Sequence, residues 1–149
     1  MLHFIGKETE MRITLESDYA LRILTVMAGY SGVTDAKTIS NDTSVTQRFT
    51  LKILHKLVQG DLVQSYKGVN GGYKLKALPS EITLKNVIEL IDGPIAIARC
   101  LDSDEGCSLN WDKSACDYHH IFDIISIELA SKLNRITIQD VIDKNYYIN

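Results

Sequence analysis

The sequence predicts a mainly α-helical fold with a small β-hairpin: a winged helix-turn-helix domain followed by a long helix suited to dimerisation. Two observations carry this prediction. Three helical patterns precede a pair of short alternating strands, which is the order of elements in a winged helix-turn-helix. A later helix has an apolar stripe too wide for one small head to cover. We therefore expect an N-terminal extension over 1–11, the winged domain over 12–78, and a cysteine-bearing loop with dimerisation helices over 79–149.

The first two helices are expected over 17–30 and 36–41. In the first, apolar residues recur densely at helical spacing. Asp18 lies near its start, where the helix dipole favours an acidic side chain. Gly29 and Gly32 predict where this helix ends.

A third helix is expected to begin at a capping box, in which Ser44 is the N-cap and Gln47 lies three residues further on. Gly60 is expected to end this helix. Its apolar residues are Phe49, Leu51, Ile53, Leu54, Leu57 and Val58. They predict one buried face and leave a polar face that carries Arg48 and Lys52.

A hairpin is expected after the third helix, with strands over 62–66 and 73–76 joined by the Gly-rich turn 67–72. In a winged helix-turn-helix the third helix enters the DNA major groove, and the hairpin lies along the backbone or the minor groove. The turn has neither the following helix nor the GK[ST] ending of a nucleotide-binding loop. We see no serine nucleophile elbow and no catalytic carboxylate pair, so we expect no enzyme.

The expected DNA contacts come from the polar face of the third helix and from the hairpin. Gln47 and Arg48, in the first helical turn, can present paired donors or acceptors to base edges. The expected phosphate contacts are Ser44, Thr46, Thr50, Lys52, Lys67, Gly71, Gly72 and Lys74. Taken alone, the third helix favours the alternative of an ordinary solvated polar face. The glycines and lysines of the hairpin favour DNA.

The net charge of −3 conceals two halves of opposite sign. Residues 12–78 hold nine Lys and Arg against five Asp and Glu, whereas 79–149 hold six against twelve. A basic N-terminal half suggests that only this part faces a polyanion. No apolar run has membrane-spanning length and no export signal is visible, so we expect no membrane partner. The odd cysteine count then favours a reducing, cytoplasmic setting.

The C-terminal half is expected to contain a short helix over 84–92 with Thr83 as its N-cap, and a last helix that opens at Thr137. A long helix is expected between them, from about 117 to 134. Its natural partner is the same helix of a second subunit. The alternative is a helix folded back on its own head.

The cysteines of the chain, Cys100, Cys107 and Cys116, lie together in a polar segment that is followed by His119 and His120. Three thiols gathered in a polar loop suggest ligands for a soft metal or an iron–sulfur cluster. The spacing contains no zinc knuckle. A site with four ligands would need one further oxygen or nitrogen donor. The alternative is a set of redox-indifferent or disulfide-forming loop cysteines.

Several segments together resemble the IscR/NsrR family of iron–sulfur transcriptional regulators. They are 11–22 (MRITLESDYALR), 47–57 (QRFTLKILHKL), 68–75 (GVNGGYKL), 82–93 (ITLKNVIELIDG), the three cysteines, and 136–140 (ITIQD). The resemblance implies a homodimeric regulator that binds a palindromic operator in double-stranded DNA and responds to the state of its cluster.

The resemblance also implies which residues hold the cluster, a 2Fe-2S or 4Fe-4S centre. Three ligands would be Cys100, Cys107 and Cys116. The fourth would be His119, as in the IscR branch, or Asp18 of the partner subunit, as in the NsrR branch. The intervals between the cysteines are longer than is usual in the family. The alternative function is a thiol- or metal-responsive interaction protein that acts through a partner protein.

Overall fold

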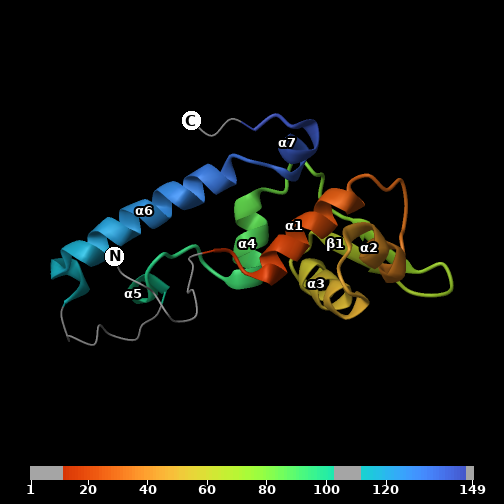
Figure 1. Ribbon diagram of the computed structural model, residues 1–149, viewed down its shortest axis with the longest axis horizontal. Helices are drawn as coiled ribbons and strands as arrows, with labels where there is room; N and C mark the ends of the chain where they lie inside the picture. Colours follow the sequence, from red (N-terminus) through yellow and green to blue (C-terminus); the bar gives the residue numbers. More distant parts are fainter. Residues whose placement is uncertain (1–11, 103–111, 147–149) are drawn as a thin grey trace, which may run out of the picture.

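The structure, a computed structural model, describes residues 12–102 and 112–146. A head of three helices and a hairpin lies at one end, and a long helix extends away from it (Figure 1). The elements of the head are α1 (Leu15–Met27), α2 (Ala36–Thr43), α3 (Gln47–Gln59), β1 (Val63–Tyr66) and β2 (Gly72–Leu75). The later elements are α4 (Leu84–Asp92), α5 (Arg99–Asp102), a 3₁₀ turn (Lys113–Ala115), α6 (Asp117–Asn134) and α7 (Ile138–Asp143). This order confirms the predicted winged helix-turn-helix with a long C-terminal helix.

The head is organised around one cluster of buried aliphatic side chains to which α1, α2 and α3 all contribute. Its members in these helices are Ala20, Ile23, Leu24, Met27, Ile39, Ile53, Leu54 and Leu57. Because α3 buries one face in this cluster, its orientation relative to α1 is set by packing within the head. The opposite face of α3 is left to solvent.

The turn between α2 and α3 differs from the prediction. Ser44 does not cap α3; it ends α2 in the left-handed conformation, with φ of 55°, and its N–H donates to the Asn41 carbonyl. Thr46 is the N-cap of α3, and it makes no side-chain capping hydrogen bond. Helix α1 likewise begins earlier than expected, because the Thr14 hydroxyl accepts from the Ser17 N–H.

The hairpin pairs β1 with β2 in antiparallel register, from Val63 opposite Leu75 to Tyr66 opposite Gly72. Tyr73 also exchanges two backbone hydrogen bonds with Thr34, at 2.8 and 2.9 Å, which fastens the hairpin to the segment before α2. A Cβ atom at Gly72 would collide with the Thr34 carbonyl oxygen. Glycine is therefore required here by the close approach of two backbones.

The last helix returns to the head. Both α4 and α7 begin with capping boxes, Thr83 with Asn86 and Thr137 with Asp140, and the two N-caps form a β-bridge. Ile138 is buried in the same core as α1. The core of the head thus takes in residues from both sides of the boundary expected after residue 78.

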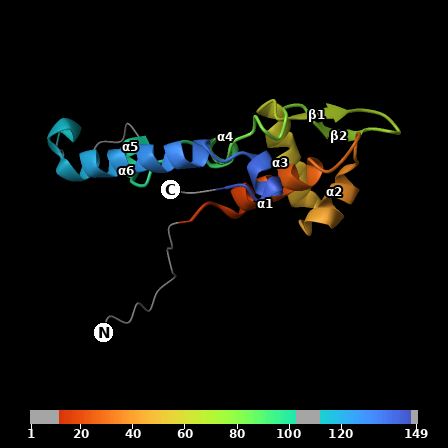
Figure 2. The ribbon, with the colours of Figure 1, turned by 90° about the horizontal axis from the view of Figure 1, so that it is seen from above.

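Helix α6 has the predicted bounds and projects from the head (Figure 2). Ser126 is its single buried residue in the described chain. Its hydroxyl donates to the Phe122 carbonyl and accepts from the Ile97 N–H at 3.1 Å, which ties the segment before α5 to the middle of α6. No helix within 12–102 or 112–146 is long and apolar enough to cross a membrane.

Candidate nucleic-acid interface and cysteine segment

The outer face of α3 carries the residues predicted to read DNA bases. Gln47 and Arg48 are exposed in its first turn, and Lys52 and His55 continue the exposed face toward its C-terminus. Ser44 and Thr46, in the turn before α3, are exposed as well. Of the predicted contacts in the helix-turn-helix, five are therefore accessible to solvent: Ser44, Thr46, Gln47, Arg48 and Lys52.

Two residues of α3 lie on the opposite side from the one expected. Thr50, a predicted phosphate contact, is fully buried, and its hydroxyl donates to the Val45 carbonyl at 3.4 Å. It packs in the core and cannot reach a phosphate without unfolding the turn. Leu51, which was assigned to the core, is 43% exposed. An apolar side chain on this face can contact a thymine methyl group.

Lys52 is exposed, but it is engaged within the protein. Its ammonium group forms an ion pair with one carboxylate oxygen of Glu16, and Lys56 binds the other oxygen at 2.8 Å. These two hydrogen bonds hold the pKa of Glu16 below its ordinary value. A phosphate contact by Lys52 would have to compete with this pair.

The tip of the hairpin is a second exposed cationic surface. Lys67 and Lys74 are both exposed, and Val69 at the tip is wholly exposed. Gly71 approaches the Tyr66 carbonyl so closely that a Cβ atom would collide with it. Glycine is therefore required at position 71 by a close approach within the turn, and the exposed apolar side chain of Val69 was not predicted from the sequence.

Asp18, one of the two candidates for the fourth cluster ligand, lies on α1 in the head. Its carboxylate accepts from Arg22 at 2.8 Å, and its side chain is 48% exposed. The first turn of α6 lies at the far end of the molecule from α1 (Figures 1 and 2). Asp18 therefore lies far from the first turn of α6 in its own chain.

The cysteine segment begins and ends on ordered structure. Cys100 lies in α5 rather than in a loop, and Cys116 is the N-cap of α6; both are free thiols of intermediate exposure. His119 follows in the first turn of α6. Cys107 lies outside the described residues. Within 12–102 and 112–146, no three His, Cys, Asp or Glu side chains gather as a metal site.

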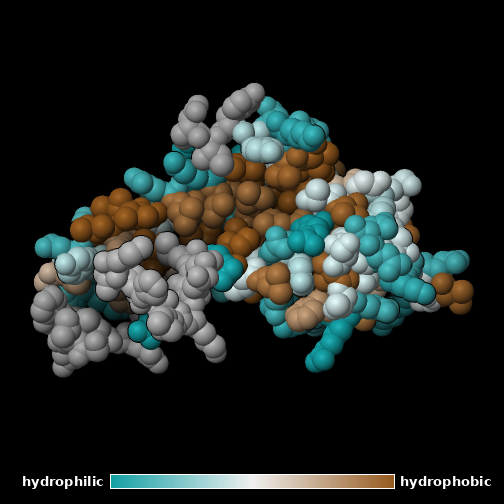
Figure 3. Space-filling view, in the orientation of Figure 1, coloured by the Kyte–Doolittle hydropathy of each residue, from teal (hydrophilic) through white to brown (hydrophobic). Residues whose placement is uncertain are grey.

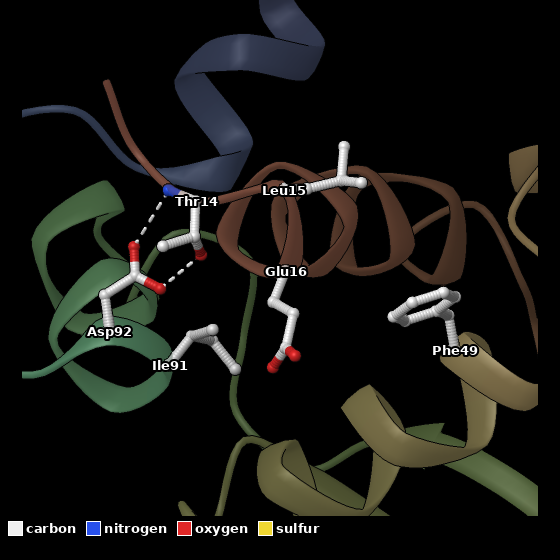
Figure 4. A pocket seen from close by; sticks show the side chains of 6 residues that line it. All are labelled: Thr14, Leu15, Glu16, Phe49, Ile91 and Asp92. Carbon is white, nitrogen blue, oxygen red and sulfur yellow. Dashed lines mark hydrogen bonds between the residues drawn. The ribbon is translucent and has the colours of Figure 1, made fainter. Parts of the chain in front are cut away.

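A pocket of about 410 Å³ lies at the end of α4, beside Leu129 of α6. The chain that follows α4 lines it from Gly93 to Ile97, and Ile88 and Leu129 contribute apolar walls. A second pocket, of about 520 Å³, lies where α1, α3 and the end of α4 meet (Figure 4).

The helix-turn-helix, its exposed polar face and the basic hairpin define a winged-helix DNA-binding protein. The sequence of residues 13–144 matches the Rrf2 family, described as "Iron-dependent Transcriptional regulator". The chain belongs to this family. It is accordingly a DNA-binding transcriptional regulator and not an enzyme.

Individual proteins with similar sequences are consistent with this family assignment. Protein aau3 of Rhizobium meliloti is 32% identical over 108 residues, which cover 67% of this chain and 70% of that protein. The HTH-type transcriptional regulator NsrR of Bacillus subtilis is 23% identical over 135 residues, covering 89% and 90% of the two chains.

Solved structures show the same fold. CymR, the global cysteine regulator of B. subtilis, aligns with a TM-score of 0.70 at 22% identity, over 91% of this chain and 98% of that one. IscR of T. potens aligns with a TM-score of 0.70 at 17% identity, over 91% and 89%.

Proposed function

We propose that this protein is a homodimeric regulator that binds a palindromic operator and changes its operator affinity with the state of an iron–sulfur cluster. The observation that carries the proposal is the pair of free thiols, Cys100 and Cys116, at the two ends of one segment. They lie on α5 and at the start of α6, two elements that pack together. The family's description as iron-dependent supports an iron centre.

The donor set fits such a centre. Cys100 and Cys116 are neither paired in a disulfide nor fully buried, so both sulfurs are available as thiolate ligands. Cys107 supplies the third thiol from the intervening segment. His119 lies three residues after Cys116 on α6, so both side chains are on the same face of the first turn. An imidazole is an established substitute for a thiolate in clusters of lower cysteine content.

The fourth ligand distinguishes two arrangements. With His119, all four ligands come from one chain. With Asp18, the carboxylate must come from the partner subunit, because α1 and the first turn of α6 lie far apart within one chain. Asp18 would also have to leave Arg22, with which it forms an ion pair at 2.8 Å. The donor set is complete in either arrangement.

Dimerisation through α6 would set the spacing of the two heads. The exposed apolar side chains of α6 form a continuous surface (Figure 3). They include Tyr118, Ile121, Phe122, Ile125 and Leu129. Two recognition helices must reach half-sites about one helical turn apart, so a small change in their separation changes the affinity. This surface gives the dimer its proposed axis.

When bound, the cluster would supply a redox- and iron-sensitive cross-link between the sulfur ligands. A series of contacts connects the proposed cluster ligands to the helix-turn-helix head. Cys100 is three residues from Ile97, whose N–H is held by Ser126 of α6. The segment from Gly93 to Ile97 then leads back to α4 and lines the pocket at the end of that helix. Ordering α5 against α6 would therefore select one orientation of α4, and with it of the head.

The proposal is tested by anaerobic purification, with an absorption spectrum and iron and sulfide counts. We expect each of Cys100→Ser, Cys107→Ser and Cys116→Ser to lose the visible absorption. Asp18→Ala and His119→Ala should differ, since only the true ligand's variant alters the spectrum; His120→Ala is the matched control on the same helix.

DNA binding is tested with the sequence that the protein selects from a random pool. Apo and loaded dimers should differ at least several-fold in affinity for it. Protein that carries no iron, and whose operator binding responds instead to thiol oxidation, would support the alternative of a thiol-responsive regulator. Equal operator binding by both forms would contradict a sensing role for the cluster.

A further inference from the structure

Glu16 is the second residue of α1 and lies beside α3, the helix that is proposed to read DNA. One oxygen of its carboxylate contacts Lys52 and the other contacts Lys56 at 2.8 Å. The exposed fractions of these side chains are 24% for Glu16, 53% for Lys52 and 32% for Lys56. One carboxylate therefore holds two of the cations of α3, one helical turn apart, against the flank of α1.

The same junction is braced by the end of α4. Lys56 also donates to the Ile91 carbonyl at 3.4 Å, and Asp92 accepts from the Thr14 N–H at 3.2 Å and from its hydroxyl. Figure 4 shows Glu16 directed from α1 toward α3, with Asp92 on Thr14. Helices α1, α3 and α4 thus meet beside the Glu16 carboxylate. Several contacts, rather than one flexible ion pair, fix the position of this carboxylate.

The charge of Glu16 is maintained by its partners. Hydrogen bonds from Lys52 and then Lys56 lower the pKa of the carboxyl group, against a smaller effect of burial. At neutral pH the group is an anion that faces the same two ammonium groups that a DNA phosphate would attract. An internal carboxylate and an external phosphate therefore compete for the same cations.

We propose that Glu16 is a positioning residue that withholds Lys52 and Lys56 from DNA phosphates and thereby raises the discrimination between operator and random DNA. Lysine contacts to phosphates strengthen binding to every sequence equally, whereas base contacts carry the specificity. With the two lysines held on α1, the outer face of α3 contacts DNA mainly through residues such as Gln47 and Arg48. The inference rests on the proposed docking of α3 in the major groove, which Arg48→Ala tests separately.

The test measures binding of the full-length protein to a random duplex over a range of salt concentrations. Glu16→Gln keeps the shape of the side chain and removes its charge. We expect several-fold tighter binding to random DNA at low salt. The plot of log K against log [salt] should also become steeper, by up to about 0.9 for each lysine that gains a phosphate. The ratio of operator to random affinity should fall.

The matched control is Glu89→Gln, which makes the same change in net charge. Glu89 is paired with Lys85 on α4, at 3.7 Å, and no lysine of α3 is involved. Its effect measures the general loss of negative charge. Adding Lys52→Gln and Lys56→Gln to Glu16→Gln should restore the wild-type salt slope. In the wild-type background Lys52→Gln should leave the slope unchanged, a result that does not require the Glu16 variant to fold.

Two outcomes would overturn the proposal. One is a Glu16→Gln salt slope equal to that of Glu89→Gln. The other is weaker binding of Glu16→Gln to random DNA, which would mean that Glu16 directs the lysines onto the phosphates. If Arg48→Ala leaves operator discrimination intact, it is the docking of α3 that fails, and this result is distinguishable from both.

Discussion

Replacing Ile125 by glutamate should separate the proposed dimer into monomers. Ile125 lies in the middle of the apolar surface of α6 and is 44% exposed in the isolated chain. A carboxylate at this position would be buried in the proposed subunit interface, and the residues one helical turn away on α6, 121–122 and 128–129, include no cation. By two-fold symmetry the change occurs twice in each dimer.

The magnitude follows from the area still exposed. Full burial of an isoleucine side chain contributes roughly 1.5–3 kcal/mol. Ile125 has 44% of its surface left to bury. Removing that burial on both subunits, as in Ile125→Ala, should therefore cost about 1.5–2.5 kcal/mol. That cost weakens dimerisation roughly 10- to 60-fold. Ile125→Glu adds the desolvation of two carboxylates and should leave monomers at micromolar concentration.

Sedimentation velocity over a dilution series measures this directly. The control is Leu78→Glu, in the link between β2 and α4, because Leu78 is 62% exposed and receives the same chemical change. It should leave the dimer intact. A monomeric wild-type protein, or an Ile125→Glu variant that remains as dimeric as Leu78→Glu, would refute the assignment of α6 as the interface.

Three further results are expected. Arg48→Ala should cost about 1–3 kcal/mol at the selected operator and little on random DNA, whereas Lys74→Ala should weaken both about equally in anisotropy titrations. Thr50→Val should leave operator affinity unchanged and cost at most about 1 kcal/mol in urea unfolding, since the hydrogen bond that the hydroxyl group donates to the Val45 carbonyl is long, at 3.4 Å. A loss of operator affinity in Thr50→Val would instead support the original prediction that Thr50 contacts DNA. The pKa of Glu16 is lower in the folded protein than its ordinary value of 4.5, so its ion pairs stabilise the fold above that pH and are lost as the pH falls through the lower value. The unfolding midpoint of the wild type should therefore approach that of Glu16→Gln in acid.

Elements with strong local signals were predicted well from the sequence. Helix α6 has the expected bounds, 117–134, and α4 begins after Thr83 as expected. Thr137 opens α7 for the same reason. At the starts of α4 and α7 the capping side chain and its partner lie three residues apart, so the information that begins the helix is present in the segment itself.

Features that depend on packing between segments were not predicted. Ser44 and Gln47 have capping-box spacing, yet Ser44 adopts a left-handed conformation because Val45 is buried in the head beside Ser40. The spacing of apolar residues predicted that one face of α3 is buried, but it did not fix which residues lie at the edges of that face. Leu51 was therefore predicted to be buried and Thr50 exposed, whereas the structure has the reverse. The pairs that Glu16 makes with α3 join residues at least 36 positions apart, and no local pattern signals such a contact.

The two candidates for the fourth ligand of the proposed cluster differ in whether the site needs a second subunit, and this difference lets one experiment test the proposed dimer and the proposed cluster together. If Asp18 of the partner subunit completes the cluster, the donor set exists only after α6 has paired with its copy. The monomeric Ile125→Glu variant should then fail to take up iron and sulfide under conditions that load the wild type. If His119 is the ligand, the site is complete in one chain, and the same variant should be loaded normally. The Leu78→Glu dimer controls for the added charge, and the spectra of Asp18→Ala and His119→Ala must agree with the outcome. A monomer that keeps its cluster while Asp18→Ala loses it would contradict assembly of the site between subunits.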